Sequence, residues 1–172
     1  NPSAHELTTG PEIYSQLDGK VDAVICGVGT GGTITGLGKY FEKKSPATEM
    51  ILADPKGSIV KDTVEKNPVK DADYSWLVEG IGEDFIPDTL DIKYIKKAYE
   101  ISNEEAFDAI KTLALNEGIL AGSSSGTLIS AALKYCKEQE KTKNVVTFVC
   151  DNGEKYLNTA YNKLWLKEKN LI

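Results

Sequence analysis

The sequence contains no arginine, so all 20 of its basic side chains are lysines, against 26 aspartates and glutamates. The formal net charge of −6 argues against a nucleic-acid partner, because such proteins use basic patches to meet phosphates. Arginine is the side chain that binds a carboxylate or phosphate with two parallel hydrogen bonds, so the chain lacks a side-chain clamp of this kind. Any such clamp must therefore come from backbone amides or from another chain.

Cysteine and histidine are scarce as well. The three cysteines, Cys26, Cys136 and Cys150, are too few and too scattered for a disulfide framework or a zinc site, so we expect no metal centre. Cys26 and Cys150 stand in apolar, strand-like runs, which predicts buried free thiols and a reducing, cytoplasmic location. His5 is the single histidine, and we expect a structural role for it rather than a catalytic one.

A signal peptide and an apolar run of about eighteen residues are both missing, so we expect no membrane segment. The 172 residues suffice for one domain with a substantial core. The sequence begins with Asn1-Pro2 instead of methionine, which we interpret as the sign of a fragment or a processed product.

Apolar, β-branched runs alternate with amphipathic helical patterns along the chain. The fold class that this alternation predicts is α/β, with an open, mostly parallel sheet and helices on both faces. Residues 92–101 fit a strand or a helix, and Ser102-Asn-Glu-Glu105 is a capping-box pattern that starts a helix. Strands are expected at 21–26, 50–53 and 145–149, and helices at 9–17, 33–45, 102–117, 127–136 and 156–165.

Two turns rich in small residues follow apolar runs and lead into helices, at 27–33 and at 122–127. In a parallel sheet such turns lie at the carboxyl ends of the strands, where ligands bind. Glycines let the backbone close on a phosphate, and a helix N-terminus adds N–H donors and partial positive charge. The turn at 27–33 is therefore predicted to hold a phosphate-bearing ligand.

A dinucleotide is one candidate, because Gly27-Val-Gly29-Thr-Gly31-Gly32 satisfies G-x-G-x-x-G and Asp54 follows at a strand end, where a ribose-binding acid would stand. The match is weak by itself, and no Gly-Lys-Ser/Thr follows that would indicate a P-loop. The threonines in Gly29-Thr-Gly-Gly-Thr33 suit a terminal phosphate monoester such as that of pyridoxal phosphate. A serine of the run Ser123 to Ser125 could then meet the pyridine nitrogen, a choice that suits β-replacement better than transamination.

A second glycine-rich segment, Gly80-Ile81-Gly82, fits either a loop that brings backbone close to a ligand or a simple surface turn. Residue patterns alone leave both open.

Four stretches carry a wider resemblance: Gly29-Thr-Gly-Gly-Thr-Ile-Thr-Gly36, Asp54-Pro-Lys-Gly-Ser-Ile59, Val78-Glu-Gly-Ile-Gly82 with Asp84-Phe-Ile-Pro87, and Glu117-Gly-Ile-Leu-Ala-Gly-Ser-Ser-Ser-Gly126. The chain resembles the cysteine synthase and cystathionine β-synthase family of fold-type II pyridoxal phosphate enzymes. The second and third stretches are most similar to its cystathionine β-synthase branch.

The resemblance implies roles for matching residues. Ser124 would hydrogen-bond the pyridine nitrogen of the cofactor, and Gly80, Ile81 and Gly82 would lie near the ring and the substrate amino acid. The cofactor phosphate would be held by Gly29, Thr30, Gly31, Gly32 and Thr33. The implied reaction replaces the β-substituent of serine, or of an activated serine, with the thiol of homocysteine to give cystathionine.

Three alternatives stay open. Sulfide as the thiol would make the enzyme an O-acetylserine sulfhydrylase, a cysteine synthase. The second alternative is a non-catalytic half-enzyme or binding module. The third and most distant is a dehydrogenase.

No stretch matches the family's N-terminal half, which carries the Schiff-base lysine. Residues 1–172 are therefore expected to form a single phosphate-binding lobe, the C-terminal large-lobe portion, without a catalytic residue of its own and inactive alone. The partners implied for the complete protein are an amino acid, a thiol and a second copy in a homodimer.

Overall fold

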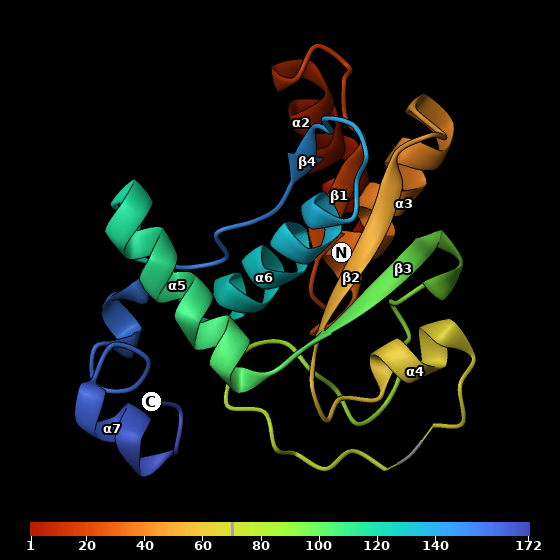
Figure 1. The fold of residues 1–172 in the computed structure, drawn as a ribbon. Helices are drawn as coiled ribbons and strands as arrows, with labels where there is room; N and C mark the ends of the chain where they lie inside the picture. Colours follow the sequence, from red (N-terminus) through yellow and green to blue (C-terminus); the bar gives the residue numbers. More distant parts are fainter. Residues whose placement is uncertain (70) are drawn as a thin grey trace.

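The computed structural model describes residues 1–69 and 71–172 and contains a four-stranded parallel sheet in the order β3-β2-β1-β4 (Figure 1). The strands are β1 (Ala23–Cys26), β2 (Glu49–Pro55), β3 (Ile95–Ile101) and β4 (Val145–Val146). The helices are α1 (Pro2–Ala4), η1 (His5–Thr9), α2 (Gly10–Gln16), α3 (Gly32–Lys44), α4 (Val60–Glu65), η2 (Ile92–Tyr94), α5 (Asn103–Glu117), α6 (Ser123–Lys137), η3 (Gly153–Tyr156) and α7 (Lys163–Glu168).

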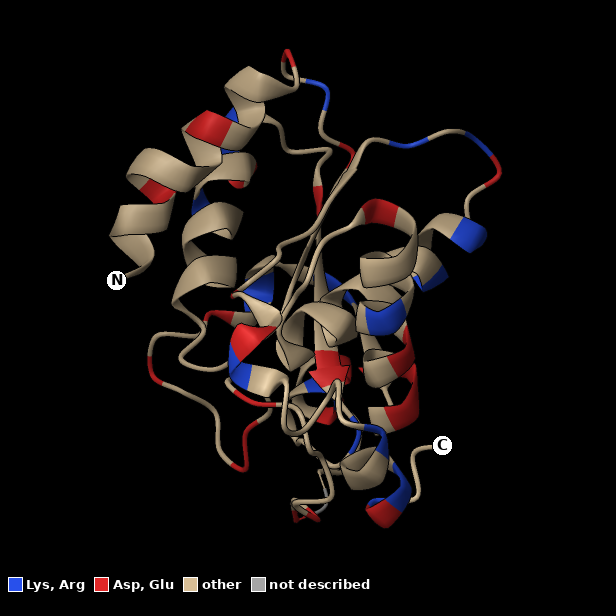
Figure 2. Cartoon of the chain, turned by 90° about the vertical axis from the view of Figure 1, so that its left-hand side faces the viewer, with Lys and Arg blue, Asp and Glu red and all other residues tan. Residues whose placement is uncertain are grey.

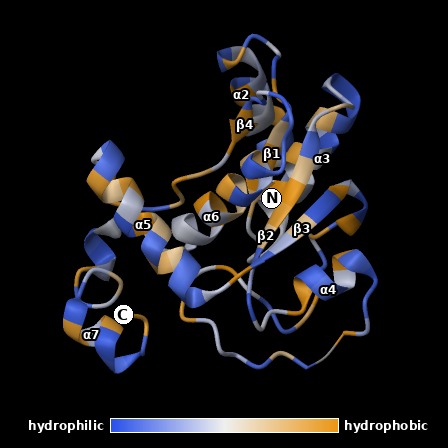
Figure 3. Ribbon diagram, viewed as in Figure 1, coloured by the Kyte–Doolittle hydropathy of each residue, from blue (hydrophilic) through white to orange (hydrophobic). Residues whose placement is uncertain are grey.

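The sheet is covered on both faces, because successive side chains of a strand point to opposite sides. Val24 and Cys26 of β1 pack with Ile34, Leu37 and Phe41 of α3. The alternating residues Ala23 and Ile25 pack with side chains of α6 on the other face. This burial explains why β1 is a continuous apolar run, and Figure 3 shows the hydrophobic colouring of the central strands. The predicted α/β fold class is confirmed.

Several predicted boundaries are wrong. The helix expected at 127–136 begins at Ser123, so most of the predicted turn at 122–127 is the first turn of α6. The first helix begins at Pro2 and continues through the π-helix η1, so Thr9 makes no side-chain cap. The strand expected at 145–149 pairs with β1 only at Val145 and Val146, and farther along the chain the amide of Cys150 bonds to Ser125 of α6 at 2.9 Å. The helix expected at 156–165 is divided, since Asn162 caps a new helix by accepting the amide of Leu164 at 2.9 Å.

The order of the strands creates a switch point between β1 and β4. The chain runs from β1 outward to β2 and β3, then returns to place β4 on the other side of β1. Loops leaving β1 and β4 therefore diverge and leave a crevice at the carboxyl end of the sheet, where ligands of open α/β sheets bind.

Lysines and acidic residues are interspersed over the helices and loops in Figure 2. Among the described residues, no helix is both long and apolar enough to cross a membrane. Within the same residues, no group of three or more histidines, cysteines and acids could hold a metal ion.

Candidate functional site

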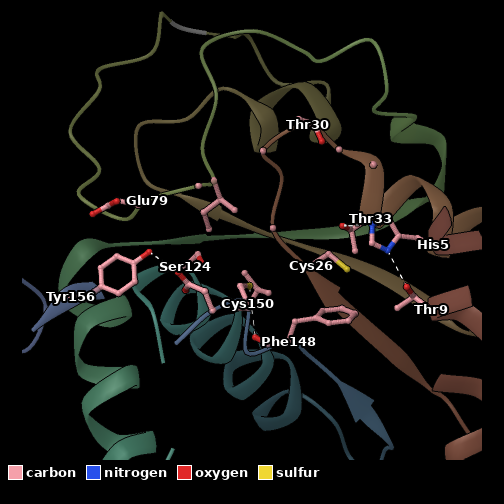
Figure 4. A pocket seen from close by; sticks show the side chains of 18 residues that line it. His5, Thr9, Cys26, Thr30, Thr33, Glu79, Ser124, Phe148, Cys150 and Tyr156 are labelled. Atoms are coloured by element: carbon pink, nitrogen blue, oxygen red, sulfur yellow. Dashed lines mark hydrogen bonds between the residues drawn. The ribbon is translucent and has the colours of Figure 1, made fainter. Parts of the chain in front are cut away.

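A pocket of about 750 Å³ lies at this switch point (Figure 4). His5 and Thr33 stand at one end of it, Tyr156 and Glu79 stand at the other, and Ser124 and Cys150 lie between them. The pocket thus draws on segments from the whole length of the chain.

The glycine turn after β1 forms one wall. Gly31 has a φ of +79°, a left-handed conformation that glycine adopts without strain, and α3 begins at the next residue. No side chain caps this helix start, so N–H groups of its first turn remain free for an anion. The structure brings Gly29, Thr30, Gly31, Gly32 and Thr33 together on the pocket wall, as expected.

A second segment closes on this turn. The amide of Gly82 donates to the carbonyl of Val28 at 3.0 Å, and a Cβ at Gly29 would stand 2.6 Å from the carbonyl oxygen of Gly80. Gly80 and Ile81 line the pocket, whereas Gly82 turns away and packs against Trp76. Gly80-Ile81-Gly82 thus packs closely against the turn after β1, and its approach to a ligand stays a prediction.

The three consecutive serines at the start of α6 are used differently. The hydroxyl oxygen of Ser123 accepts the amide of Glu79 at 3.1 Å, and that of Ser125 accepts the amide of Cys150 at 2.9 Å. Ser124 lines the pocket with 6% of its surface exposed, and its hydroxyl bonds to none of the residues that the structure describes. Ser124 is therefore the serine whose hydroxyl faces the pocket and is free to meet a bound molecule.

His5 and Thr9 are pocket residues that the sequence analysis missed. They lie in η1, where the amide of Gly10 bonds to the carbonyl of His5, five residues back, as in a π-helix. The imidazole Nδ1 is 3.0 Å from the hydroxyl of Thr9, and Nε2 is 3.2 Å from the hydroxyl of Thr33. The spacing of His5 and Thr9, four apart on a helix, is the one signal that could have paired them.

The opposite end of the pocket is acidic. The hydroxyl of Tyr156 donates to Oδ2 of Asp151 at 2.9 Å, and Glu79 lies nearby on the lining. Burial, reinforced by this hydrogen bond, raises the pKa of Tyr156 to about 12, so the phenol stays protonated at neutral pH. No sequence motif marked Tyr156 or Asp151.

Two thiols face the same pocket in different states. Cys26 is buried, and burial raises the pKa of its thiol far above the ordinary value, which keeps it protonated and unreactive. Cys150 is exposed, so the prediction that both are buried is wrong for it. The cause is the early end of β4, which leaves Cys150 beyond the sheet.

Asp54 lies away from the pocket lining. Its carboxylate is buried and Oδ2 accepts the amide of Lys61 at 2.8 Å, at the start of α4. Burial raises the pKa of Asp54 to about 6. The acid that the dinucleotide alternative assigned to a ribose therefore caps a helix instead.

The family model described as "Pyridoxal-phosphate dependent enzyme" matches residues 1–151. The chain belongs to this family. Members similar to it include a cysteine synthase of Staphylococcus aureus strain N315, 43% identical over 160 residues that make up 92% of this chain and 49% of that protein. Cysteine synthase A of Escherichia coli K12 is 41% identical over 175 residues, 99% of this chain and 54% of its own length. Cysteine synthase A of Salmonella typhi is 42% identical, with the same coverage.

The chain thus spans about half the length of the curated relatives it matches. Their names agree with the sulfide-using alternative rather than with the cystathionine β-synthase branch that the motifs favoured.

Pyridoxal phosphate is the cofactor of this family, and the pocket fits it. The uncapped start of α3, the glycine cradle and the threonine hydroxyls suit a phosphate, while the unpartnered Ser124 hydroxyl suits a ring nitrogen. Within the described residues no lysine lines the pocket.

Proposed function

We propose that this chain forms the phosphate- and ring-binding part of a pyridoxal phosphate enzyme that makes cysteine by β-replacement. An activated serine, such as O-acetylserine, would supply the carbon skeleton and sulfide the sulfur. The observation that carries the proposal is that the three serines differ in their partners. Ser123 and Ser125 accept hydrogen bonds within the fold, and Ser124 faces the pocket without a partner among the described residues.

Each wall has a defined task in this proposal. Amides of the first turn of α3 and the hydroxyls of Thr30 and Thr33 hold the phosphate, which needs no arginine. Ser124 donates its hydroxyl proton to the pyridine nitrogen. Gly80 and Ile81 shape the side of the pocket that meets the ring and the amino acid.

The choice of serine at the ring nitrogen fits the reaction. Bound pyridoxal phosphate withdraws electrons from the α-carbon of an attached amino acid. A neutral hydroxyl leaves the ring nitrogen largely unprotonated, whereas a carboxylate would hold a proton there and favour full delocalisation. Ser124 therefore suits loss and replacement of a β-substituent.

The experiment uses the complete protein. Purified enzyme is given O-acetylserine with sulfide or serine with homocysteine, and cysteine and cystathionine are measured by mass spectrometry. We expect cysteine to form at the higher kcat/KM. Preferential cystathionine formation would instead support the β-synthase branch, and no turnover of either pair would support a binding module.

Variants test the site itself. Ser124→Ala should weaken cofactor affinity about three- to tenfold, the loss of one hydrogen bond, measured by the absorbance of bound pyridoxal phosphate. Ser130→Ala is the matched control, because Ser130 lies on the same helix but bonds to the carbonyl of Glu105 at 2.9 Å. Equal cofactor affinities in the two variants would remove Ser124 from this role.

A further inference from the structure

His5 has a position that the proposed function does not use. Its ring connects η1 to the start of α3 by touching Thr9 with one nitrogen and Thr33 with the other, at 3.0 and 3.2 Å. The packing here is tight, since a Cβ at Gly36 would stand 2.8 Å from Cβ of His5. The ring is thus held between two hydroxyls, one of which lies in the proposed phosphate cradle.

The two hydroxyls give the imidazole two possible hydrogen-bond patterns. If Nε2 lacks a proton, it accepts from Thr33, and the single proton of that hydroxyl points away from the pocket. If Nε2 carries a proton, it donates to the oxygen of Thr33, and the hydroxyl proton is free for a ligand. Only the second pattern makes Thr33 a donor to an anion.

We propose that His5 is a positioning residue which holds Thr33 as a hydrogen-bond donor to the bound phosphate group, with Nε2 protonated. This proposal rests on the proposed function, because it needs an anion at Gly29 to Thr33. Thr9 sets the ring orientation through Nδ1. The phosphate thereby selects the protonated form of Nε2, as neutral tautomer or as imidazolium.

The charged groups near His5 do not replace the hydroxyls of Thr9 and Thr33 as partners of its ring nitrogens. Glu6, on the same π-helix, pairs with Lys43 of α3 at 2.7 Å. The charged groups on the elements packed around His5 are the Asn1 amine, Glu6, Glu12, Lys39, Glu42, Lys43 and Lys44, and none of them lines the pocket. The acids on the lining, Glu79 and Asp151, stand at its far end, as Figure 4 shows for Glu79.

The test uses the fact that His5 is the only histidine in the chain. Its two ring nitrogens give one unambiguous set of signals in long-range ¹H–¹⁵N spectra, where protonated and bare nitrogens are widely separated. Spectra are recorded at a fixed pH of about 8, with and without inorganic phosphate. We expect saturating phosphate to move Nε2 to the protonated position.

Two substitutions at His5 separate positioning from packing. The amide nitrogen of glutamine can occupy the place of Nε2, and that of asparagine the place of Nδ1. His5→Gln should therefore keep phosphate affinity within about twofold, whereas His5→Asn should weaken it about fivefold, a typical single hydrogen bond. Circular dichroism checks that both variants are folded.

The outcomes are distinct. Phosphate binding with an unprotonated Nε2, or with equal affinities for the glutamine and asparagine variants, would overturn the role of His5 and leave the cradle standing. Failure of the unsubstituted chain to bind either phosphate or pyridoxal phosphate would overturn the cradle, and the role of His5 with it.

Discussion

Three strands of the sheet run directly toward a helix, but only one of these junctions is left open. After β3, Ser102 and Glu105 close the start of α5: the serine hydroxyl oxygen accepts the amide of Glu105 at 3.3 Å, and the glutamate accepts the amide of Ser102 at 3.0 Å. After β2, the carboxylate of Asp54 accepts an amide at the start of α4. After β1, no side chain among the described residues caps α3.

This difference supports the proposed position of the ligand. A helix N-terminus presents N–H groups that need acceptors, and side chains supply them at α4 and α5. At α3 the chain offers glycines instead, and its first residues face the pocket. An exogenous anion is thus the natural acceptor there, and the two closed junctions show what the open one lacks.

The largest expected effect comes from filling the open junction. Gly29→Ala places a Cβ 2.6 Å from the carbonyl oxygen of Gly80, which forces the two walls apart. We expect pyridoxal phosphate affinity to fall by about 100-fold, measured by titration of absorbance. Gly118→Ala is the control for a strained glycine substitution outside the pocket: its Cβ meets nothing within 4 Å, and its φ of +69° strains the end of α5 without touching the site. Equal affinities in both variants would show that the cradle is not where the anion binds.

The closed junction at α4 predicts a pH effect. The pKa of Asp54 is raised from 3.8 to about 6, so the native state holds this proton more tightly than the unfolded state. Its contribution to stability is therefore lost as pH rises from about 4 to about 6. Asp54→Asn removes the penalty, and its free energy of unfolding relative to wild type should rise by about 2 kcal/mol between pH 4 and pH 7. Urea unfolding at several pH values measures this; a difference that is constant with pH would contradict it.

Occupation of the open junction should shield a thiol. Cys150 and Cys136 are both exposed. Cys150 lines the pocket, whereas Cys136 lies on α6 outside the pocket lining. Bound pyridoxal phosphate should slow alkylation of Cys150 by iodoacetamide about tenfold, which for a rate corresponds to about 1.4 kcal/mol. Peptide mass spectrometry gives both rates in one sample, and Cys136 should react at an unchanged rate. Shielding of both thiols, or of neither, would place the cofactor outside this pocket.

The smallest effect is expected at the closed junction of α5. Ser102→Ala removes the capping box and should lower the free energy of unfolding by about 1 kcal/mol, as measured by urea titration. Cofactor affinity should stay the same, because Ser102 lies outside the pocket. A loss of affinity comparable to that of Gly29→Ala would erase the distinction between open and closed junctions.

Local patterns predicted the junctions well. The continuous apolar run of β1, the capping box at Ser102 and the glycine turn before α3 each depend on residues close in sequence. The placement of Ser124 at the pocket followed from a resemblance, and the residue pattern alone left three serines open. Only the partners of Ser123 and Ser125 separate them, and those partners come from distant segments.

The residues that the sequence analysis missed or misplaced owe their positions to tertiary structure. His5 reaches the site through a π-helix, a conformation that no propensity in residues 1–10 indicates, and through Thr33, 28 residues away. Cys150 lies four residues beyond the end of β4 at Val146, and its amide bonds to the Ser125 side chain of α6 instead of a neighbouring strand. Asp54 matched a ribose-binding position by spacing alone, but in the structure its carboxylate accepts the amide of Lys61 at the start of α4.

The most direct test of the open junction is to observe the amides themselves. ¹H–¹⁵N spectra of the chain are recorded during titration with pyridoxal phosphate, and inorganic phosphate serves as the simpler probe. The amides of Gly31, Gly32 and Thr33 should shift together with saturation, while those of Lys61 and Glu105, already bonded to side chains, should not. Shifts at Lys61 or Glu105 without shifts at Gly31 to Thr33 would contradict the assignment of the anion to the start of α3.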